Sequence, residues 1–477
     1  EERLETFKGY LNSFETEKIQ KKIKKLLDPN LKKPKRTIEE LFPRDEVMQK
    51  VTRNTQEMKV CKSLDEFAKH PESYDSLEVK LKVRQENVLE SQLNLLANAL
   101  PQSRLTALDL QGSFIGMKGG IMIAHALPRC QLTSLNLKGC KVGKAAESIL
   151  AFVPDSKLTF LNLSKNFIRK NGYISIGNCL HKSQLTTLDL SANELVEEWA
   201  IEIGEALPKS KLTTLNLRSN EIDDQGVIVI RKALPKSNLT TLNLRNNEIE
   251  DEGAIAIVKA LPKSKLTTLN LRNNKIRSEG GIAIGNALPN TQLISLDLSE
   301  NIIGKRALIK IGNNLPYSQL VSLAVNLNIN LGSSSKTNSG LKDLGGFNAI
   351  KNALPDSQLT TLNLESNQIE ELASVEIARV LPHTKLTTLN LERNKLKDKG
   401  LETIANVLPK TKLVSLNLGY NEIGDEGAIA IANVLPHTKL TTLSLEGNKV
   451  EDKGAEAIAN VLPRTKLVSL NLKDNKI

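Results

Sequence analysis

Residues 239–249 carry the stretch that decides the fold, which reads Leu-Thr-Thr-Leu-Asn-Leu-Arg-Asn-Asn-Glu-Ile. Close copies of it recur along the 477-residue chain. The first Leu of each copy stands at positions 105, 132, 158, 185, 212, 239, 266, 293, 320, 359, 386, 413, 440 and 467. Eleven of the thirteen intervals are 27 residues, one is 26 and one is 39. Self-similarity at a fixed period of this length indicates a repeat architecture.

Each copy predicts a short strand, a turn and a helix. The alternation of leucines with polar residues has the period of a strand with one buried face. An Asn stands three residues after the last strand Leu, as Asn247 does, and we expect its amide to bond free backbone groups of neighbouring coils. Residues 251–261 predict a helix with acidic residues at its start, which complement the helix dipole, and Pro262 ends it.

A unit of 27 residues cannot bury its own apolar side, whereas stacked copies can. The pattern resembles the leucine-rich repeat, specifically the ribonuclease-inhibitor type, which has a true helix in each unit. Ribonuclease inhibitor, the Ran GTPase-activating protein and the NOD-like receptors are of this type. The resemblance covers about 400 of the 477 residues. It implies an α/β fold, a leucine-rich-repeat solenoid (horseshoe) of about 14 strand–helix units.

The ends of the chain differ from these units. Residues 1–75 predict a small all-α region, with apolar heptad spacing over 2–27 and capping boxes that begin at Thr37 and Ser63. Its apolar seam would pack on the cap or form a dimer surface. Residues 76–104 predict an N-terminal capping repeat with Leu81 and Val83 in its strand.

Residues 105–477 form the predicted solenoid, with an insertion at about 331–346. The insertion is Gly/Ser-rich and predicts either a tolerated loop or a partner-contacting one. The chain starts without Met and stops eleven residues into its last unit, so we expect a fragment of a longer product.

The residues that carry catalysis in known motifs are missing. The sequence contains no HExxH, GxSxG or GxGxxG, and its four cysteines form no CxxC pair. Most carboxylates stand at helix starts, where the helix dipole explains them. We therefore expect no enzyme activity, no metal and no cofactor. The alternative, a GTPase-activating or otherwise GTPase-regulating protein, rests on the family resemblance alone, and no functional residue of that family can be placed here.

Candidate partner-binding residues follow from the one strand position that varies in blocks. Arg218, Arg245 and Arg272 form a basic ladder on consecutive strands, and Glu365, Glu392 and Glu446 form an acidic counterpart. Like charges on adjacent strands are destabilising, which indicates a partner of opposite charge, although recent duplication would also copy them. Two further candidates, Phe160 and Tyr420, are aromatic residues expected on the concave face. The last two, Trp199 and Lys336, are expected at the edge of the solenoid. Trp199 is equally well explained as a local packing substitute.

The charge balance sets the partner classes. The net charge is +11, with a sequence pI near 9.2. Nucleic acid is a second alternative, disfavoured because basic and acidic residues are interleaved and only 3% of residues are aromatic. The basic runs at 21–25 and 32–36 resemble a two-part nuclear-localisation signal or a solvated helix face. No apolar run is long enough for a membrane span.

These patterns favour a cytoplasmic scaffold that binds another protein through its concave face and adjacent loops. The regular Leu-Pro-Lys/His-Ser/Thr-Lys-Leu-Thr-Thr-Leu-Asn-Leu units are similar to those of repeat proteins from intracellular bacteria, including secreted effectors that act on host proteins. That resemblance implies a place in the host cytosol or nucleus. The oligomeric state cannot be predicted.

Overall fold

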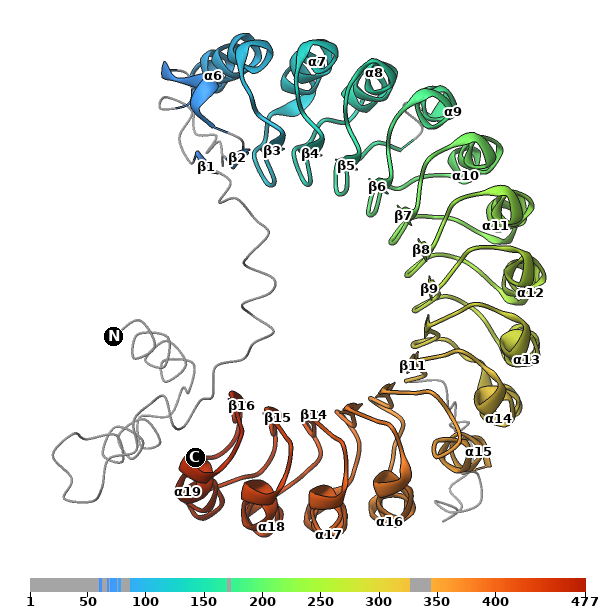
Figure 1. Cartoon of the computed structure of the whole chain (residues 1–477), viewed down its shortest axis with the longest axis vertical. Helices are drawn as coiled ribbons and strands as arrows, with labels where there is room; N and C mark the ends of the chain where they lie inside the picture. The colour runs from blue at the N-terminus through green and yellow to red at the C-terminus, as the bar shows by residue number, and fades with distance from the viewer. Residues whose placement is uncertain are drawn as a thin grey trace, which may run out of the picture. The chain divides into compact units, whose positions relative to one another are not determined.

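A computed structural model describes residues 60–61, 67, 69–74, 76–78, 86–169, 173–326 and 345–477. The chain divides into two compact units. The first unit is Val47–Asp297, and the second unit comprises Leu298–Ile477 among the described residues. Within each unit the strands lie side by side on the inner, concave face and the helices cover the outer face (Figure 1).

The strands of the first unit follow chain order, and each is parallel to its neighbour. Equivalent leucines pair across them, as Leu215 does with Leu242. These strands are β1 (Val60–Cys61), β2 (Ser76–Glu78), β3 (Ala107–Asp109), β4 (Ser134–Asn136), β5 (Phe160–Asn162), β6 (Thr187–Asp189), β7 (Thr214–Asn216), β8 (Thr241–Asn243), β9 (Thr268–Asn270) and β10 (Ser295–Asp297). The predicted strand of each repeat is confirmed.

One helix follows each of these strands from the second onward, and its apolar residues are buried against the strand leucines. The helices of the first unit are α6 (Glu86–Ala99), α7 (Gly116–Ala126), α8 (Ala145–Phe152), α9 (Tyr173–Lys182), α10 (Glu197–Ala206), α11 (Asp224–Ala233), α12 (Asp251–Ala260) and α13 (Ser278–Ala287). In α12 the residues Ile257 and Ala260 are buried together with Leu261, as predicted. The core is therefore aliphatic and continuous along the unit.

The second unit has the same organisation. Its helices are α14 (Gly304–Asn314), α15 (Gly345–Ala353), α16 (Glu371–Val380), α17 (Lys397–Ala405), α18 (Asp425–Val434) and α19 (Asp452–Val461). Its strands are β11 (Ser322–Ala324), β12 (Thr361–Asn363), β13 (Thr388–Asn390), β14 (Ser415–Asn417), β15 (Thr442–Ser444) and β16 (Ser469–Asn471). Because Leu323 pairs with Leu362, the strand ladder continues past the 39-residue interval.

The Leu-Pro pair does not simply end the helix. The chain passes from α12 into a 3-10 turn, Leu261–Lys263, in which Pro262 lies. The fixed φ of proline suits such a turn, and its missing N–H is not needed there. The buried hydroxyl of Ser264 donates to the Leu261 carbonyl at 3.0 Å, which closes the turn before the next strand.

The asparagine prediction is confirmed by a ladder of hydrogen bonds between repeats. Nδ2 of Asn247 donates to the carbonyl of Leu217 in the preceding repeat at 3.1 Å and to that of Leu244 at 3.0 Å. Its Oδ1 accepts from the backbone N–H of Ile222 at 3.2 Å. Cys140 stands at the same position and donates its thiol to the Leu110 carbonyl at 2.9 Å. Each repeat thus satisfies backbone groups of the one before it.

A second ladder runs in the opposite direction and was not predicted. Oδ1 of Asp251, at the start of α12, accepts hydrogen bonds from the backbone N–H groups of Arg277 and Gly280 in the next repeat, both at 2.8 Å. Asp398 does the same for Gly424 and Gly427. These carboxylates therefore cap the helix of the next repeat, in addition to lying at the positive end of their own.

The N-terminal cap departs from its prediction. Its strand is β2, in which Leu77 pairs with Leu108, so the predicted register, which put Leu81 opposite Leu108, was wrong. Leu81 and Val83 themselves lie outside the described residues. The prediction assumed a 27-residue offset, whereas the pairing spans 31 residues. A further strand, β1, pairs with β2 inside the range that was expected to be all helical. The predicted helix over 2–27 and both capping boxes lie outside the described residues.

Candidate interaction surfaces

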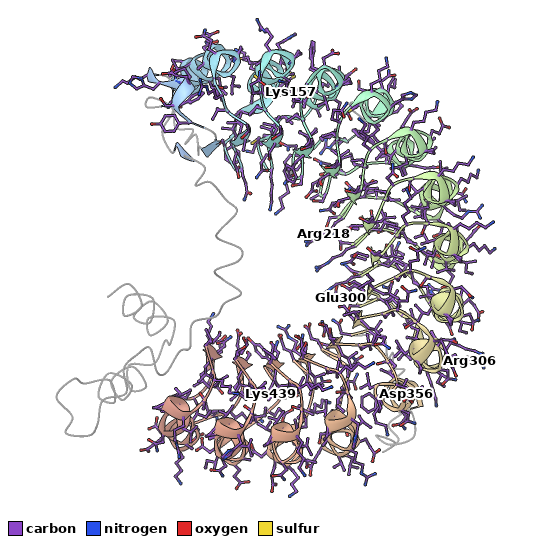
Figure 2. All side chains as sticks on the ribbon, in the orientation of Figure 1. Lys157, Arg218, Glu300, Arg306, Asp356 and Lys439 are labelled. Atoms are coloured by element: carbon purple, nitrogen blue, oxygen red, sulfur yellow. The ribbon has the colours of Figure 1, made fainter. Side chains whose placement is uncertain are left out.

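The basic ladder lies on the concave face of the first unit. The ladder position is the second residue after a strand, and it is occupied after β7, β8 and β9 by Arg218, Arg245 and Arg272, respectively. The carbonyl of Arg245 accepts from the backbone N–H of Ser219, and that of Arg272 from Asn246, both at 2.8 Å. The three arginines are consecutive rungs of one backbone ladder, so their Cα atoms are spaced at about 4.8 Å. Arg218 is exposed and the other two are half-buried, and Figure 2 places Arg218 on the inner side.

The acidic counterpart lies on the concave face of the second unit. Glu365, Glu392 and Glu446 follow β12, β13 and β15 at the same position of the repeat. Arg393 lies between two of them, with Nη1 at 3.3 Å from Glu365 and 3.1 Å from Glu392. One guanidinium thus faces two carboxylates, and the cluster keeps a negative excess.

Tyr420 lies within this acidic cluster. Its ring stacks under the Arg393 guanidinium, with 4.9 Å from Cζ to the ring centroid, and its hydroxyl donates to Glu446 at 3.5 Å. The ring also lies close to Gly447, where a Cβ would clash with it. Burial and the Glu446 carboxylate raise the pKa of Tyr420 above its usual value. The result is an aromatic and acidic surface that suits a basic side chain.

Trp199 is not a surface anchor, which corrects the edge-site prediction. Its side chain is fully buried, and Nε1 donates to the Arg169 carbonyl at 2.7 Å. It replaces a glycine that in other repeats faces an aspartate, as Gly280 faces Asp251. The corresponding residue before Trp199 is Lys170 rather than aspartate. The alternative interpretation of Trp199, a packing substitute, fits this geometry.

The other two candidates have different outcomes. Phe160 begins β5, pairs in register with Thr187 and is half-buried, so part of its ring is available on the concave face. Lys336 and the insertion at about 331–346 fall mostly outside the described residues, which resume at Gly345.

In the described part of the chain, no group of three or more His, Cys, Asp or Glu residues could hold a metal ion. Burial raises the pKa of the Cys130 thiol to about 11 and of the Cys140 and Cys179 thiols to about 12. Their positions fit the prediction that these three are small core residues.

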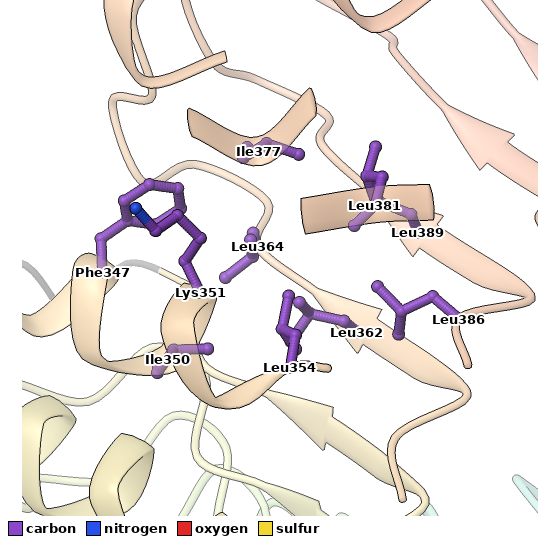
Figure 3. Close-up of a pocket in the computed structure, with 10 residues that line it drawn as sticks. All are labelled: Phe347, Ile350, Lys351, Leu354, Leu362, Leu364, Ile377, Leu381, Leu386 and Leu389. Atoms are coloured by element: carbon purple, nitrogen blue, oxygen red, sulfur yellow. The ribbon is translucent and has the colours of Figure 1, made fainter. Parts of the chain in front are cut away.

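One cavity lies beside α15 in the second unit. It has a volume of about 10 Å³ and is lined by aliphatic side chains with Phe347 and Lys351 (Figure 3). Nζ of Lys351 donates to Oε2 of Glu376 at 2.7 Å. A space of this size is barely that of one water molecule, so it is a packing defect rather than a ligand site.

Strands on the inner face, a buried asparagine after each and a helix on the outer face together define a leucine-rich-repeat solenoid. Six segments of the chain match the leucine-rich-repeat family model, at residues 209–230, 236–258, 263–285, 383–405, 410–432 and 437–459. No curated protein matches the chain. No helix in the described ranges is long and apolar enough to cross a membrane.

In solved structures, 139 chains match this chain. One is an internalin from Listeria monocytogenes, at 19% identity and a TM-score of 0.43, with 80% of this chain and 92% of the internalin covered. Another is the Rad7–Elc1 complex of yeast, at 18% identity and a TM-score of 0.44, with 73% of this chain and 76% of the yeast chain covered. At such identities the likeness concerns the fold alone.

Proposed function

We propose that this protein is a non-catalytic scaffold that binds another protein through the concave faces of its two units. The observation that carries the proposal is the basic ladder. Three arginines on consecutive rungs place a strip of positive charge on the concave face, which a partner with acidic side chains would complement. Concave surfaces of this kind are what solenoid proteins use for binding.

The second unit supports a different contact chemistry. Its acidic cluster around Tyr420 would accept a basic side chain between Glu392 and Glu446, where Gly419 leaves the strand position without a side chain. Tyrosine and arginine, as in Tyr420 and Arg393, are among the residues enriched in binding hot spots. The two units thus offer opposite charges, and the partner that we propose carries both an acidic and a basic patch.

The test compares two variants of the full chain with equal changes in charge. The first carries Arg218→Glu, Arg245→Glu and Arg272→Glu, and the second carries Lys209→Glu, Lys236→Glu and Lys263→Glu in the same three repeats. Circular dichroism must show unchanged folding in both. Quantitative pull-down from lysate, followed by titration of the purified partner, gives the affinity. We expect the arginine variant to lose a discrete partner that the lysine variant keeps; equal recovery of that partner by both variants would overturn the proposal.

We also propose, from the resemblance of the repeats, that the chain acts as a secreted bacterial effector on host proteins in the cytosol or nucleus. A fusion to a calmodulin-dependent adenylate cyclase reports transfer into host cells. A rise in host cyclic AMP supports the proposal, and its absence in a strain that secretes a control effector contradicts it. The loop around Lys336 remains a predicted partner contact.

A further inference from the structure

The cations of the first unit gather at the C-terminal ends of its helices. After each Leu-Pro pair, or its equivalent, the chain has an exposed residue, a buried Ser, Thr or Cys, and a second exposed residue. We call the row that these exposed residues form along the repeats the Leu-Pro edge. Among the sixteen such positions in the first unit, nine are basic and one, Asp155, is acidic. The nine cations are Arg104, Arg129, Lys157, Lys182, Lys209, Lys211, Lys236, Lys263 and Lys265, and all are exposed.

The acidic residues of the same repeats gather at the opposite ends of the helices. Between residues 185 and 290, the loops and first turns before α10 to α13 contain eleven acidic residues and five basic ones. Three of the five are the arginines of the concave face, and the other two are Lys275 and Arg277. The helices are seen nearly end-on in Figure 1, so the two ends of the helices form opposite flanks of the unit. Between residues 185 and 290, charges that are interleaved in the sequence are therefore separated onto two flanks by the fold. In the loops and first turns before α7 to α9, the flank opposite the Leu-Pro edge instead carries cations such as Lys118, Lys144 and Lys165.

The cations of the Leu-Pro edge are not neutralised by the protein. None of the nine forms an ion pair with a carboxylate among the described residues. Where their side chains bond at all, they reach neutral groups of the neighbouring repeat, as Lys265 does with Oδ1 of Asn238 at 2.7 Å and Lys385 in the second unit does with Gln358 at 2.8 Å. The edge keeps its positive charge.

Capping of helix C-termini explains only part of this pattern. The influence of the helix dipole falls off within the last turn. Lys211 and Lys265 each stand five residues beyond the end of their helix, at Ala206 and Ala260. The helix dipole therefore does not account for Lys211 and Lys265, whereas Lys209, Lys236 and Lys263 lie in the last turn of the 3-10 segments that follow the helices.

The second unit has the same edge, although its concave face has the opposite charge. The cations there are Lys385, Lys410, Lys412, Lys439, Arg464 and Lys466. The concave position changes from arginine to glutamate between the units, whereas the Leu-Pro edge remains basic. The charge of this edge is thus independent of the charge on the binding face proposed above.

We propose that the Leu-Pro edge is a docking surface for an anionic lipid bilayer. The loops of one flank lie on one side of the unit, which suits a planar partner rather than a groove-following one. The edge of the first unit has seven lysines against two arginines, and no aromatic residue among its sixteen positions. Base readout and single-strand binding use arginine forks and aromatic stacking, which are scarce on this edge, whereas lysine clusters are sufficient for anionic headgroups. The contact is peripheral, because the charges lie on loops.

The experiment uses the full chain and sedimentation with vesicles. One set contains phosphatidylcholine alone and the other phosphatidylcholine with phosphatidylserine, both at physiological ionic strength. The test variant carries Lys209→Glu, Lys236→Glu and Lys263→Glu. The matched control carries Arg218→Glu, Arg245→Glu and Arg272→Glu, which alters the net charge equally in the same repeats but on the concave face. Duplex DNA and single-stranded RNA of mixed sequence provide the competing ligands.

We expect binding to the phosphatidylserine vesicles and not to phosphatidylcholine alone. Each lysine near such a surface contributes about fivefold in affinity, so loss of three lowers it by roughly 100-fold or more. The arginine variant should bind as the wild type does. Three results would each overturn the proposal: no preference for phosphatidylserine, equal loss in both variants, or nucleic-acid binding that is tighter than vesicle binding and lost with the same lysines. The arginine variant is the test in the pull-down and the control in the vesicle experiment, and the lysine variant has the reverse roles. A failure of lipid docking is therefore distinguishable from a failure of the scaffold proposal.

Discussion

Asp251 and Gly280 are joined across a repeat boundary, since Oδ1 of Asp251 accepts a hydrogen bond from the backbone N–H of Gly280 at 2.8 Å. The contact explains the glycine. A Cβ at Gly280 would lie 2.7 Å from that oxygen and 2.9 Å from Cγ2 of Ile276. The carboxylate of one repeat can therefore approach the helix start of the next repeat this closely only when residue 280 has no side chain.

Replacement of this glycine should be destabilising. We expect Gly280→Ala to lower the free energy of unfolding by about 1–3 kcal/mol through overpacking, although alanine is the better helix former. Gly177→Ala is the matched control, because its Cβ would meet only the mobile Oε2 of Glu202 at 2.9 Å, and helix propensity then favours alanine by about 1 kcal/mol. Urea unfolding followed by circular dichroism separates the two. Equal stability of both variants would contradict the role of Asp251.

The asparagine ladder predicts unequal costs for two equivalent residues. Asn394 donates to the carbonyls of Leu364 and Leu391 at 3.0 and 2.9 Å. Asn367, which follows the 39-residue interval, has no hydrogen-bond partner for its side chain among the described residues. We expect Asn394→Ala to cost about 1–3 kcal/mol, because buried backbone groups lose their partners, and Asn367→Ala to cost less. The urea midpoints of the two variants test the order, and a greater loss for Asn367→Ala would contradict it.

Trp199 should report on the core. It is the only tryptophan and it is fully buried, so we expect blue-shifted emission in the native state, poor quenching by acrylamide, and a red shift on unfolding. Partner binding at the concave face should leave the emission unchanged. Native quenching equal to that of free indole would place Trp199 on the surface after all.

The three buried cysteines of the repeats should be unreactive in the folded protein. Their thiol pKa values are raised to about 11 or 12 by burial, and the thiolate is the reactive form. We expect alkylation by iodoacetamide at pH 8 to be slow at Cys130, Cys140 and Cys179 and fast at all three in urea. Site-resolved mass spectrometry measures both rates. Rapid native labelling of Cys140 would rule out its place in the ladder.

The Lys351–Glu376 pair predicts a small pH dependence of stability. The hydrogen bond from Lys351 lowers the pKa of Glu376 below its usual value. A carboxyl group whose pKa is lower in the folded state contributes stability above its unfolded pKa of about 4.3, and this is lost as the pH falls. The Glu376 side chain is 33% exposed, so we expect less than about 1 kcal/mol.

Glu376→Gln should therefore lower the urea midpoint at pH 7 and leave it nearly unchanged at pH 3. Glu402→Gln is the control, because Glu402 forms only an exposed pair with Lys399. A loss for Glu376→Gln that is the same at both pH values would show that the carboxylate charge is not involved.

Leucine spacing was sufficient to predict the strands, the helices and the asparagine ladder, because each depends on a period that the sequence displays directly. The strand of the cap was misplaced because a 27-residue offset was extended to a coil with a different pairing, in which Leu77 faces Leu108. The aspartate contacts were missed for another reason. The sequence places Asp251 at a helix start but does not show that its carboxylate faces Gly280 of the following repeat.

The candidate surfaces were predicted unevenly for related reasons. Arg218 and Glu392 were assigned to the strand lining because their position in the repeat fixes the side of the strand on which they lie. Trp199 was misassigned because an isolated aromatic gives no sign of the space beneath it. The Leu-Pro edge was overlooked, since opposite charges that alternate along the chain look balanced until the helices separate them.

The two ladders point in opposite directions, and this constrains how such a gene can change. Asparagines reach back one repeat and aspartates reach forward one repeat, so a deletion or duplication of a whole 27-residue period keeps both in step. Unequal crossing-over between near-identical repeats makes changes of that size. A difference of one residue is also accommodated, because Nδ2 of Asn166 still donates to the Leu137 carbonyl at 2.8 Å across the 26-residue interval. The 39-residue interval shows the result of another length, because Asn367 beyond it has lost its place in the ladder. The protein can therefore lengthen or shorten by recombination in whole repeats. Each added or lost repeat shifts the charged patches along the solenoid and leaves the core residues of the other repeats unchanged.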